Sequence, residues 1–374
     1  NTIDHLIGIM VEFPEEVTDN PNTSGNGKIL LNSLDSMPEV LERCDGFIAD
    51  PPPHNLNYFS DQMLAVSNYF ENVSNGHQIF TYTIIDSIYE LPSLMSEYGQ
   101  TEIDLTQAFI DAVNIAADSV GNYFTSNSIV VAFHAGVGQD FAVPFIDPTP
   151  YDLSSAYIDE EMLSTIEIPE NIESFLSNGG ILLPETQNHI YYNVIEDIFY
   201  DETDFCDYQI GITGTFALLL GYAIGLPPLY NTDTGDAGVG VFGLMDHGSN
   251  NGRGIIPSPP TAWSRIYMDW ENENLVDITT DGIYTIDTSL IYKIKISDNE
   301  YFLIENRNNW IQYKADMDSL RLKNKIDDYH LGHWIDTFIE ETNENQFSQS
   351  NSGVITSISN YNFGLPGSGL LIWH

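Results

Sequence analysis

The loop from Asn231 to Asp236, with the sequence NTDTGD, carries side chains that could bind a metal ion. Asn231, Asp233 and Asp236 bring three oxygen-bearing side chains close together, and hard cations such as calcium take oxygen ligands at this sort of spacing. The loop is not an EF-hand, because no glutamate stands at the twelfth position. The competing interpretation is an Asx turn, in which the same side chains bond their own backbone. Calcium binding at this loop is therefore one of two interpretations of its sequence.

Three further residues could line a ligand site. Asp246 and His247 follow a methionine in "GLMDHGS", where they could ligate a metal or cap a turn, and capping is the favoured interpretation. His134 ends an apolar run in "FHAGVGQD", whose glycines would let a backbone come close to a ligand. His134 is therefore either a pocket residue or a buried histidine bonded to the main chain.

Other groups have the right residue types but incomplete spacing. His330 and His333 lie one helical turn apart with no glutamate between them, and Glu185 and His189 lack a third ligand. No G-x-S-x-G nucleophile motif occurs. Surface histidines are the simpler interpretation for the first pair, and the second pair also lacks the apolar helix that a site of this kind needs.

The segment 212–225, "ITGTFALLLGYAIG", is apolar on every face. A helix with this pattern is buried in the middle of a domain. It contains no histidine and no carboxylate, so it offers neither a metal ligand nor a general base. Leu218, Leu219 and Leu220 are expected to pack into the core.

The surrounding pattern predicts an α+β protein with two domains. Strands are expected at 7–13, 77–86 and 128–138, and helices at 58–74, at 101–119 and from 259 onward. Residues 140–210 are expected to be irregular and acidic. After residue 271 apolar residues alternate with period two, which predicts a β-rich domain over 272–374 with a loop or insertion at 313–350.

Composition limits the partners and the location of the protein. The net charge is −44, with 11 Lys and Arg against 55 Asp and Glu, and no Lys or Arg lies between Arg43 and Arg253. Such a surface repels nucleic acid and anionic membranes and attracts cations. It also suits solvation in brine or in an acidic medium. No apolar run is long enough for a membrane span.

Two glycosylation sequons, the cysteines and the chain ends give further expectations. Asn22 and Asn72 begin Asn-x-Ser/Thr sequons, which predict a secreted protein together with the acidic composition. Cys44 and Cys206 could form one disulfide or remain thiols. The abrupt first and last segments predict that sequence is missing at one or both ends.

Several stretches together resemble the immune inhibitor A family of secreted zinc metalloproteases. Near the start of the chain the matching stretches are "IMVEFPEE", "SGNGK" and "HNLNYFSDQMLAVSNYFENVSNGHQIFTYTI". Later they are "GYAIGLPPLYNTDTG", "VFGLMDHGS", "PPTAWSRIYMDW", "YFLIENR" and "GLLIWH". The resemblance implies a metzincin-like catalytic fold, with a twisted sheet, a long active-site helix and a methionine turn, here at Met245, beneath the metal.

The zinc motif of that family is absent from this chain. The family helix carries His-Glu-x-x-His, in which the histidines bind zinc and the glutamate is the general base. Leu218 and Tyr222 stand at the two histidine positions here, and Leu219 stands at the glutamate. Neither leucine can bind a metal, and one phenolate does not make a zinc site. No zinc is therefore expected at this helix.

These observations predict a secreted, non-catalytic, metalloprotease-like protein with a binding or structural role. A protein, peptide or glycan is the expected extracellular partner, and self-assembly is a further option. The alternatives are an active metallopeptidase with reassigned ligands and a subunit of an extracellular assembly.

Overall fold

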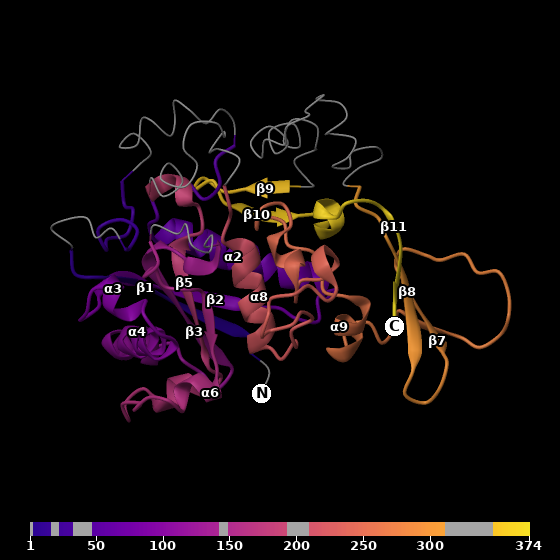
Figure 1. Ribbon diagram of the computed structural model, residues 1–374, viewed down its shortest axis with the longest axis horizontal. Coiled ribbons are helices and arrows are strands. Elements are labelled where there is room, and N and C mark those ends of the chain that lie inside the picture. Colours follow the sequence, from indigo (N-terminus) through magenta and orange to yellow (C-terminus); the bar gives the residue numbers. More distant parts are fainter. Residues whose placement is uncertain (1–2, 16–21, 33–46, 142–148, 193–208, 311–346) are drawn as a thin grey trace.

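The computed structural model describes residues 3–15, 22–32, 47–141, 149–192, 209–310 and 347–374 of the chain. A five-stranded sheet lies in the left half of the molecule as drawn in Figure 1. The strands are β1 (His5–Glu12), β2 (Thr81–Glu90), β3 (Ser128–Val137), β4 (Ala156–Ile158) and β5 (Gly180–Thr186), in the order β2-β1-β3-β5-β4. β2, β1, β3 and β5 run parallel, and β4 at one edge runs antiparallel to β5.

Helices cover both faces of this sheet. Figure 1 shows α3 (Met95–Tyr98) and α4 (Glu102–Ile115) on one side, and α2 (Leu56–Val73) and α8 (Thr213–Ala223) on the other. α5 (Ala117–Gly121) follows α4, and α6 (Glu160–Leu163) follows β4. Strands β3 and β5 are buried along their whole length, as expected for parallel strands covered on both faces. Short 3-10 helices lie at Gln139–Phe141, Glu173–Leu176, His189–Tyr192, Gly240–Phe242, His247–Asn250 and Tyr361–Gly364.

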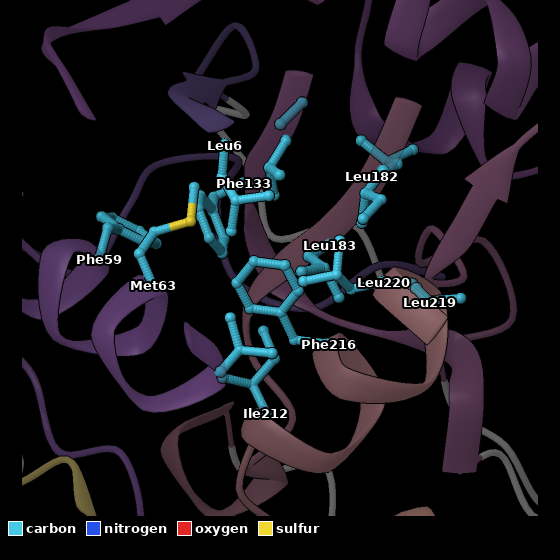
Figure 2. Close-up of a cluster of buried hydrophobic side chains, with 14 of the residues drawn as sticks. Leu6, Phe59, Met63, Phe133, Leu182, Leu183, Ile212, Phe216, Leu219 and Leu220 are labelled. Atoms are coloured by element: carbon cyan, nitrogen blue, oxygen red, sulfur yellow. The ribbon is translucent and has the colours of Figure 1, made fainter. Parts of the chain in front are cut away.

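Aromatic packing joins α2 and α8 to the sheet. In Figure 2 Phe216 of α8 points toward Phe133 of β3, and the two rings are 5.8 Å apart between centroids. Phe59 of α2 packs on the other side of Phe133, with its ring centroid 4.8 Å away. All three side chains are fully buried. Side chains of this kind contribute roughly 3–5 kcal/mol each when truncation leaves a cavity, so α8 is held firmly in place.

The α4 side of the sheet is packed just as closely at one glycine. A Cβ atom on Gly180, the first residue of β5, would overlap the ring of Phe109. Phe109 lies in α4 and is fully buried. The glycine at this position therefore lets α4 approach β5.

The chain from residue 259 onward adds a second, four-stranded sheet. α9 (Ala262–Tyr267) precedes β6 (Leu275–Ile278), β7 (Ile291–Lys295), β8 (Tyr301–Arg307) and β11 (Gly369–Trp373), and the sheet has the order β11-β8-β7-β6. Its small core contains Ala262, Ile291 and Leu303.

Two buried arginines fasten this sheet to the rest of the molecule. Arg265 pairs with Glu271 at 2.7 Å and with Glu305 at 2.9 Å. Arg307 pairs with Glu305 at 3.0 Å and donates to the carbonyl of Phe242 at 2.8 Å. Burial alone would raise the pKa of Glu305, but the charges of Arg307 and Arg265 outweigh it and lower the pKa to about 2.

A hairpin of β9 (Phe347–Gln349) and β10 (Ile355–Ile358) packs on the first part of the chain. The ring centroids of Tyr361, just after the hairpin, and Tyr69 of α2 are 4.9 Å apart. Asn68 donates to the carbonyl of Thr356 at 2.9 Å. Part of the expected β-rich region 272–374 therefore shares the main core, and the boundary at residue 271 stays a prediction.

The described chain is a mixed α/β protein with mixed sheets, which is consistent with the expected α+β class. The expectation that residues 140–210 are irregular was wrong in part, because β4, α6 and β5 lie there. None of the described helices combines the length and apolar character needed to cross a membrane.

Candidate functional site

Helix α8 is anchored at its start by a buried carboxylate from outside the helix. Asp50 accepts a hydrogen bond from the backbone N–H of Ile212 at 2.8 Å, and Gln62 donates to its other oxygen at 2.8 Å. An acid next to a helix N-terminus interacts favourably with the unpaired N–H groups there. Burial raises the pKa of Asp50, and the bonds from Ile212 and Gln62 partly offset that rise.

One face of α8 rests on the turn that contains Met245. A Cβ atom on Gly221 would meet the Met245 sulfur at 2.7 Å, and one on Gly214 would overlap the carbonyl of Ser249. Met245 is fully buried. Gly214 is therefore needed for the helix to lie this close to the backbone of the turn, and a side chain at Gly221 would displace the Met245 side chain.

The adjacent face of α8 forms the floor of a cleft, which has a volume of about 710 Å³. The helix contributes Thr215, Leu218, Leu219 and Tyr222, which recur at helical spacing. The opposite wall is the sheet edge at residues 155–159, including β4. The remaining sides are the loops at residues 228–235 and 246–250. The helix, the turn that contains Met245 and the sheet edge thus meet at one cleft.

The three positions that match the zinc motif all line this cleft. Leu219 is buried, Leu218 and Tyr222 are half-buried, and Leu220 lies on the side of the helix packed in the core. The Tyr222 hydroxyl donates to the hydroxyl of Tyr230 at 2.9 Å. Burial and this bond raise the pKa of Tyr222, so the phenol stays protonated.

These positions do not fit a zinc ion. Two of the three side chains are hydrocarbon, and the proton of Tyr222 is committed to Tyr230. Among the described residues, no group of three or more His, Cys, Asp or Glu side chains is arranged to hold a metal. No hydrolytic step through zinc can therefore be built from this helix.

Asp246 and His247 both reach the cleft, but in different ways. One carboxylate oxygen of Asp246 accepts three backbone N–H bonds, from Gly238, Val239 and Gly240, at 2.7–2.8 Å. The other oxygen accepts from the backbone of His247 at 2.7 Å. Asp246 therefore caps the turn and holds the neighbouring loop, whereas the side chain of His247 remains half exposed at the cleft wall.

The structure does not bring His134 to the cleft. His134 is fully buried in β3, and its Nδ1 donates to the carbonyl of Ala135 at 2.8 Å. Burial lowers the pKa of His134 to about 4, although the Ala135 carbonyl and Glu185 work against that shift. Of the two interpretations of this residue, a buried histidine bonded to the main chain describes it.

The side chains of the loop 231–236 form hydrogen bonds within the loop. The side-chain oxygen of Asn231 accepts from the backbone N–H groups of Asp233 at 2.9 Å and Thr234 at 3.2 Å. The Thr234 hydroxyl donates to Asp236 at 2.7 Å. This is the Asx-turn arrangement, with all these side chains exposed. Calcium at this loop stays a prediction.

A buried ion pair at the carboxyl ends of the parallel strands was not anticipated. His54 Nδ1 lies 2.6 Å from a carboxylate oxygen of Glu185, and His54 Nε2 lies 3.0 Å from the Asp50 carbonyl. Each ring nitrogen thus lies within hydrogen-bond distance of an oxygen atom. Leu30 and Gly136 donate backbone N–H groups to Glu185, each at 2.9 Å. Glu185 therefore links β5 to β3 and to the loops that carry Leu30 and His54.

Comparison with the models of known protein families finds no match. Comparisons with curated proteins and with solved structures find none either. The paired histidines His330 and His333 and the two cysteines, Cys44 and Cys206, lie outside the described residues.

Proposed function

We propose that this chain is a secreted, non-catalytic protein of metalloprotease-like architecture whose cleft binds an extended polypeptide segment. The observation that carries the proposal is the cleft between α8 and the sheet edge, with Leu218, Leu219 and Tyr222 where a zinc motif would stand. The resemblance to the immune inhibitor A family supports the same architecture, with Met245 as the methionine of the turn.

The edge strand β4 favours a peptide as the occupant. β4 is the outermost strand of its sheet, so one side of its backbone has no strand partner among the described residues. Unpaired N–H and C=O groups at a sheet edge are a template for an added strand. The cleft runs along this edge, and its floor of Leu218 and Leu219 suits an apolar side chain.

Elemental analysis and a general protease assay, with and without chelator, test the non-catalytic part. We expect no stoichiometric zinc and no cleavage. Stoichiometric zinc with chelator-sensitive cleavage would establish the active metallopeptidase instead. In a separate experiment, the zinc content of the triple variant Leu218→His, Leu219→Glu and Tyr222→His is measured. Zinc binding by this variant would show that the residues around the helix still support a zinc site.

Selection of linear peptides from a displayed library tests the binding part. Leu218→Trp fills the cleft with a large ring, and Ile115→Trp, on the exposed end of α4, is its matched control. We expect selected peptides to bind the wild type and the control but not the Leu218→Trp variant. Peptides that bind all three proteins alike would show that the cleft is not the binding site. Particles of defined large size in size-exclusion chromatography would favour the assembly-subunit alternative.

A further inference from the structure

The cleft continues into a second cavity along the same sheet edge. This side cavity has a volume of about 830 Å³ and shares Ala156, Asp159 and Thr232 with the cleft. The two cavities therefore form one groove along the sheet edge at β4. An extended chain lying along β4 would occupy both.

The two ends of this groove differ in chemistry. The cleft end presents Leu218, Leu219, Pro228 and Tyr157. Its carboxylates Asp140 and Asp246 already accept hydrogen bonds within the protein, Asp140 from Ser155 and Gln187 and Asp246 from backbone N–H groups. An apolar or aromatic side chain fits this end, because it would bury hydrocarbon without uncovering a charge.

The side cavity carries an acidic wall, which we define as Glu102, Asp159, Glu161 and Asp233. The carboxylates of Glu102, Glu161 and Asp233 are on exposed residues and make no hydrogen bond or ion pair within the part of the chain that the structure describes. Asp159 uses one oxygen to cap α6 at 2.9 Å. No Lys or Arg is found among the described residues that line either cavity.

We propose that the groove binds a peptide with an apolar or aromatic residue for the cleft and Lys or Arg for the acidic wall. This inference rests on the proposed function and adds the chemical class of the occupant. A basic side chain supplies the cation that the wall lacks, an acidic one is repelled, and a neutral one leaves the carboxylates unpaired. Alternate residues of an extended chain face the same side about 7 Å apart. The peptides for the test therefore place the basic residue about two or four positions from the apolar one, on the same side of the chain.

The test uses three synthetic peptides that share their apolar residues and differ in carrying Lys, Gln or Glu at the other positions. Binding is measured by fluorescence anisotropy at low and at high salt. We expect the Lys peptide to bind roughly tenfold more tightly than the Gln peptide at low salt, because several partly exposed pairs each add a small factor. The difference should shrink with salt, since screening acts over about 10 Å at 0.1 M.

Matched variants separate the acidic wall from the net charge of the whole protein. Glu102→Gln with Glu161→Gln removes two carboxylates from the wall. Glu71→Gln with Glu273→Gln removes two exposed carboxylates that line neither cavity. We expect the wall variant to weaken the Lys peptide about fivefold and the control to leave its affinity nearly unchanged.

Each remaining result overturns a different statement. Equal binding of the Lys and Gln peptides, or equal losses in the two variants, would overturn the basic occupant and leave the peptide cleft standing. Binding of no peptide to the wild type, or undiminished binding to the Leu218→Trp variant, would overturn the peptide cleft itself.

Discussion

Replacing Glu185 by glutamine should destabilise the fold strongly, although it changes only one atom of a buried side chain. Glu185 accepts four hydrogen bonds, from Leu30 and Gly136 N–H groups, from His54 at 2.6 Å and from the Tyr192 hydroxyl at 2.6 Å. Each carboxylate oxygen serves two of these donors. In the Glu185→Gln variant an amide NH₂ group must face one pair of donors, and the backbone N–H of that pair, from Leu30 or Gly136, loses its acceptor.

The cost can be worked from this geometry. A buried donor left without an acceptor costs about 1–3 kcal/mol, and removing one partner of a buried ion pair costs about 3–5 kcal/mol. These terms overlap, because His54 is one of the four donors. We therefore expect the Glu185→Gln variant to lose about 4 kcal/mol, out of a total of roughly 5–15 kcal/mol for a folded protein.

Urea unfolding followed by circular dichroism measures this loss at fixed salt. Glu71→Gln is the matched control, because it removes the same charge from an exposed position on α2 and should change stability by less than about 0.5 kcal/mol. Tyr192→Phe removes one donor to Glu185 and should cost about 1 kcal/mol. A loss below about 1 kcal/mol in Glu185→Gln, relative to the control, would refute the buried ion pair.

Three further predictions concern acid, packing and cations. Glu305 stabilises the fold fully above its ordinary pKa of 4.5, and this contribution, about 3 kcal/mol, should vanish as the pH falls from 4.5 through about 2. The difference in urea stability between wild type and Glu305→Gln at several pH values measures it. Leu220→Ala, at a fully buried position on α8, should cost about 2–5 kcal/mol in urea unfolding. The melting temperature should rise with salt, which screens repulsion between acids, and further with millimolar calcium. An unchanged calcium increment in Asp233→Ala with Asp236→Ala would exclude the 231–236 loop as its site.

Elements with a strong local pattern could be predicted from sequence, and those set by long-range pairing could not. Helix α8 was expected at 212–225 and spans Thr213–Ala223, because an unbroken apolar segment of that length is hard to place elsewhere. β5 was missed because its apolar run, Ile181–Leu183, is short and lies between glycines and a proline. β4 has three residues, and only its pairing with β5 defines it as a strand.

The residues of the candidate site also differ in whether a local sequence pattern could identify them. Leu218, Leu219 and Tyr222 were picked out by the resemblance, but a helix that is apolar on every face does not show which side lines a cleft, and Leu218 is half-buried there rather than packed fully into the core. The pair of His54 and Glu185 could not be predicted, because its members are 131 residues apart in the chain and only the finished sheet brings them together. The hydrogen bond between Tyr222 and Tyr230 could not be predicted either. Tyr222 aligns with a metal-ligand position of the family that the chain resembles, so nothing in the sequence indicated a tyrosine partner for it.

The absence of Lys and Arg between residues 43 and 253 has a practical consequence for the groove. Trypsin cuts only after Lys and Arg, and every residue that lines the groove lies between Gly99 and Asn250. The whole groove, with α2, α8 and strands β2 to β5, is therefore contained in one tryptic fragment even when the chain is unfolded. A search for this protein by tryptic peptides would miss its central part, whereas a protease that cuts after glutamate or aromatic residues would divide it. An enzyme of trypsin-like specificity in the surroundings could clip the arginine- and lysine-bearing sheet near the C-terminal end and still leave the groove as one uncut length of chain.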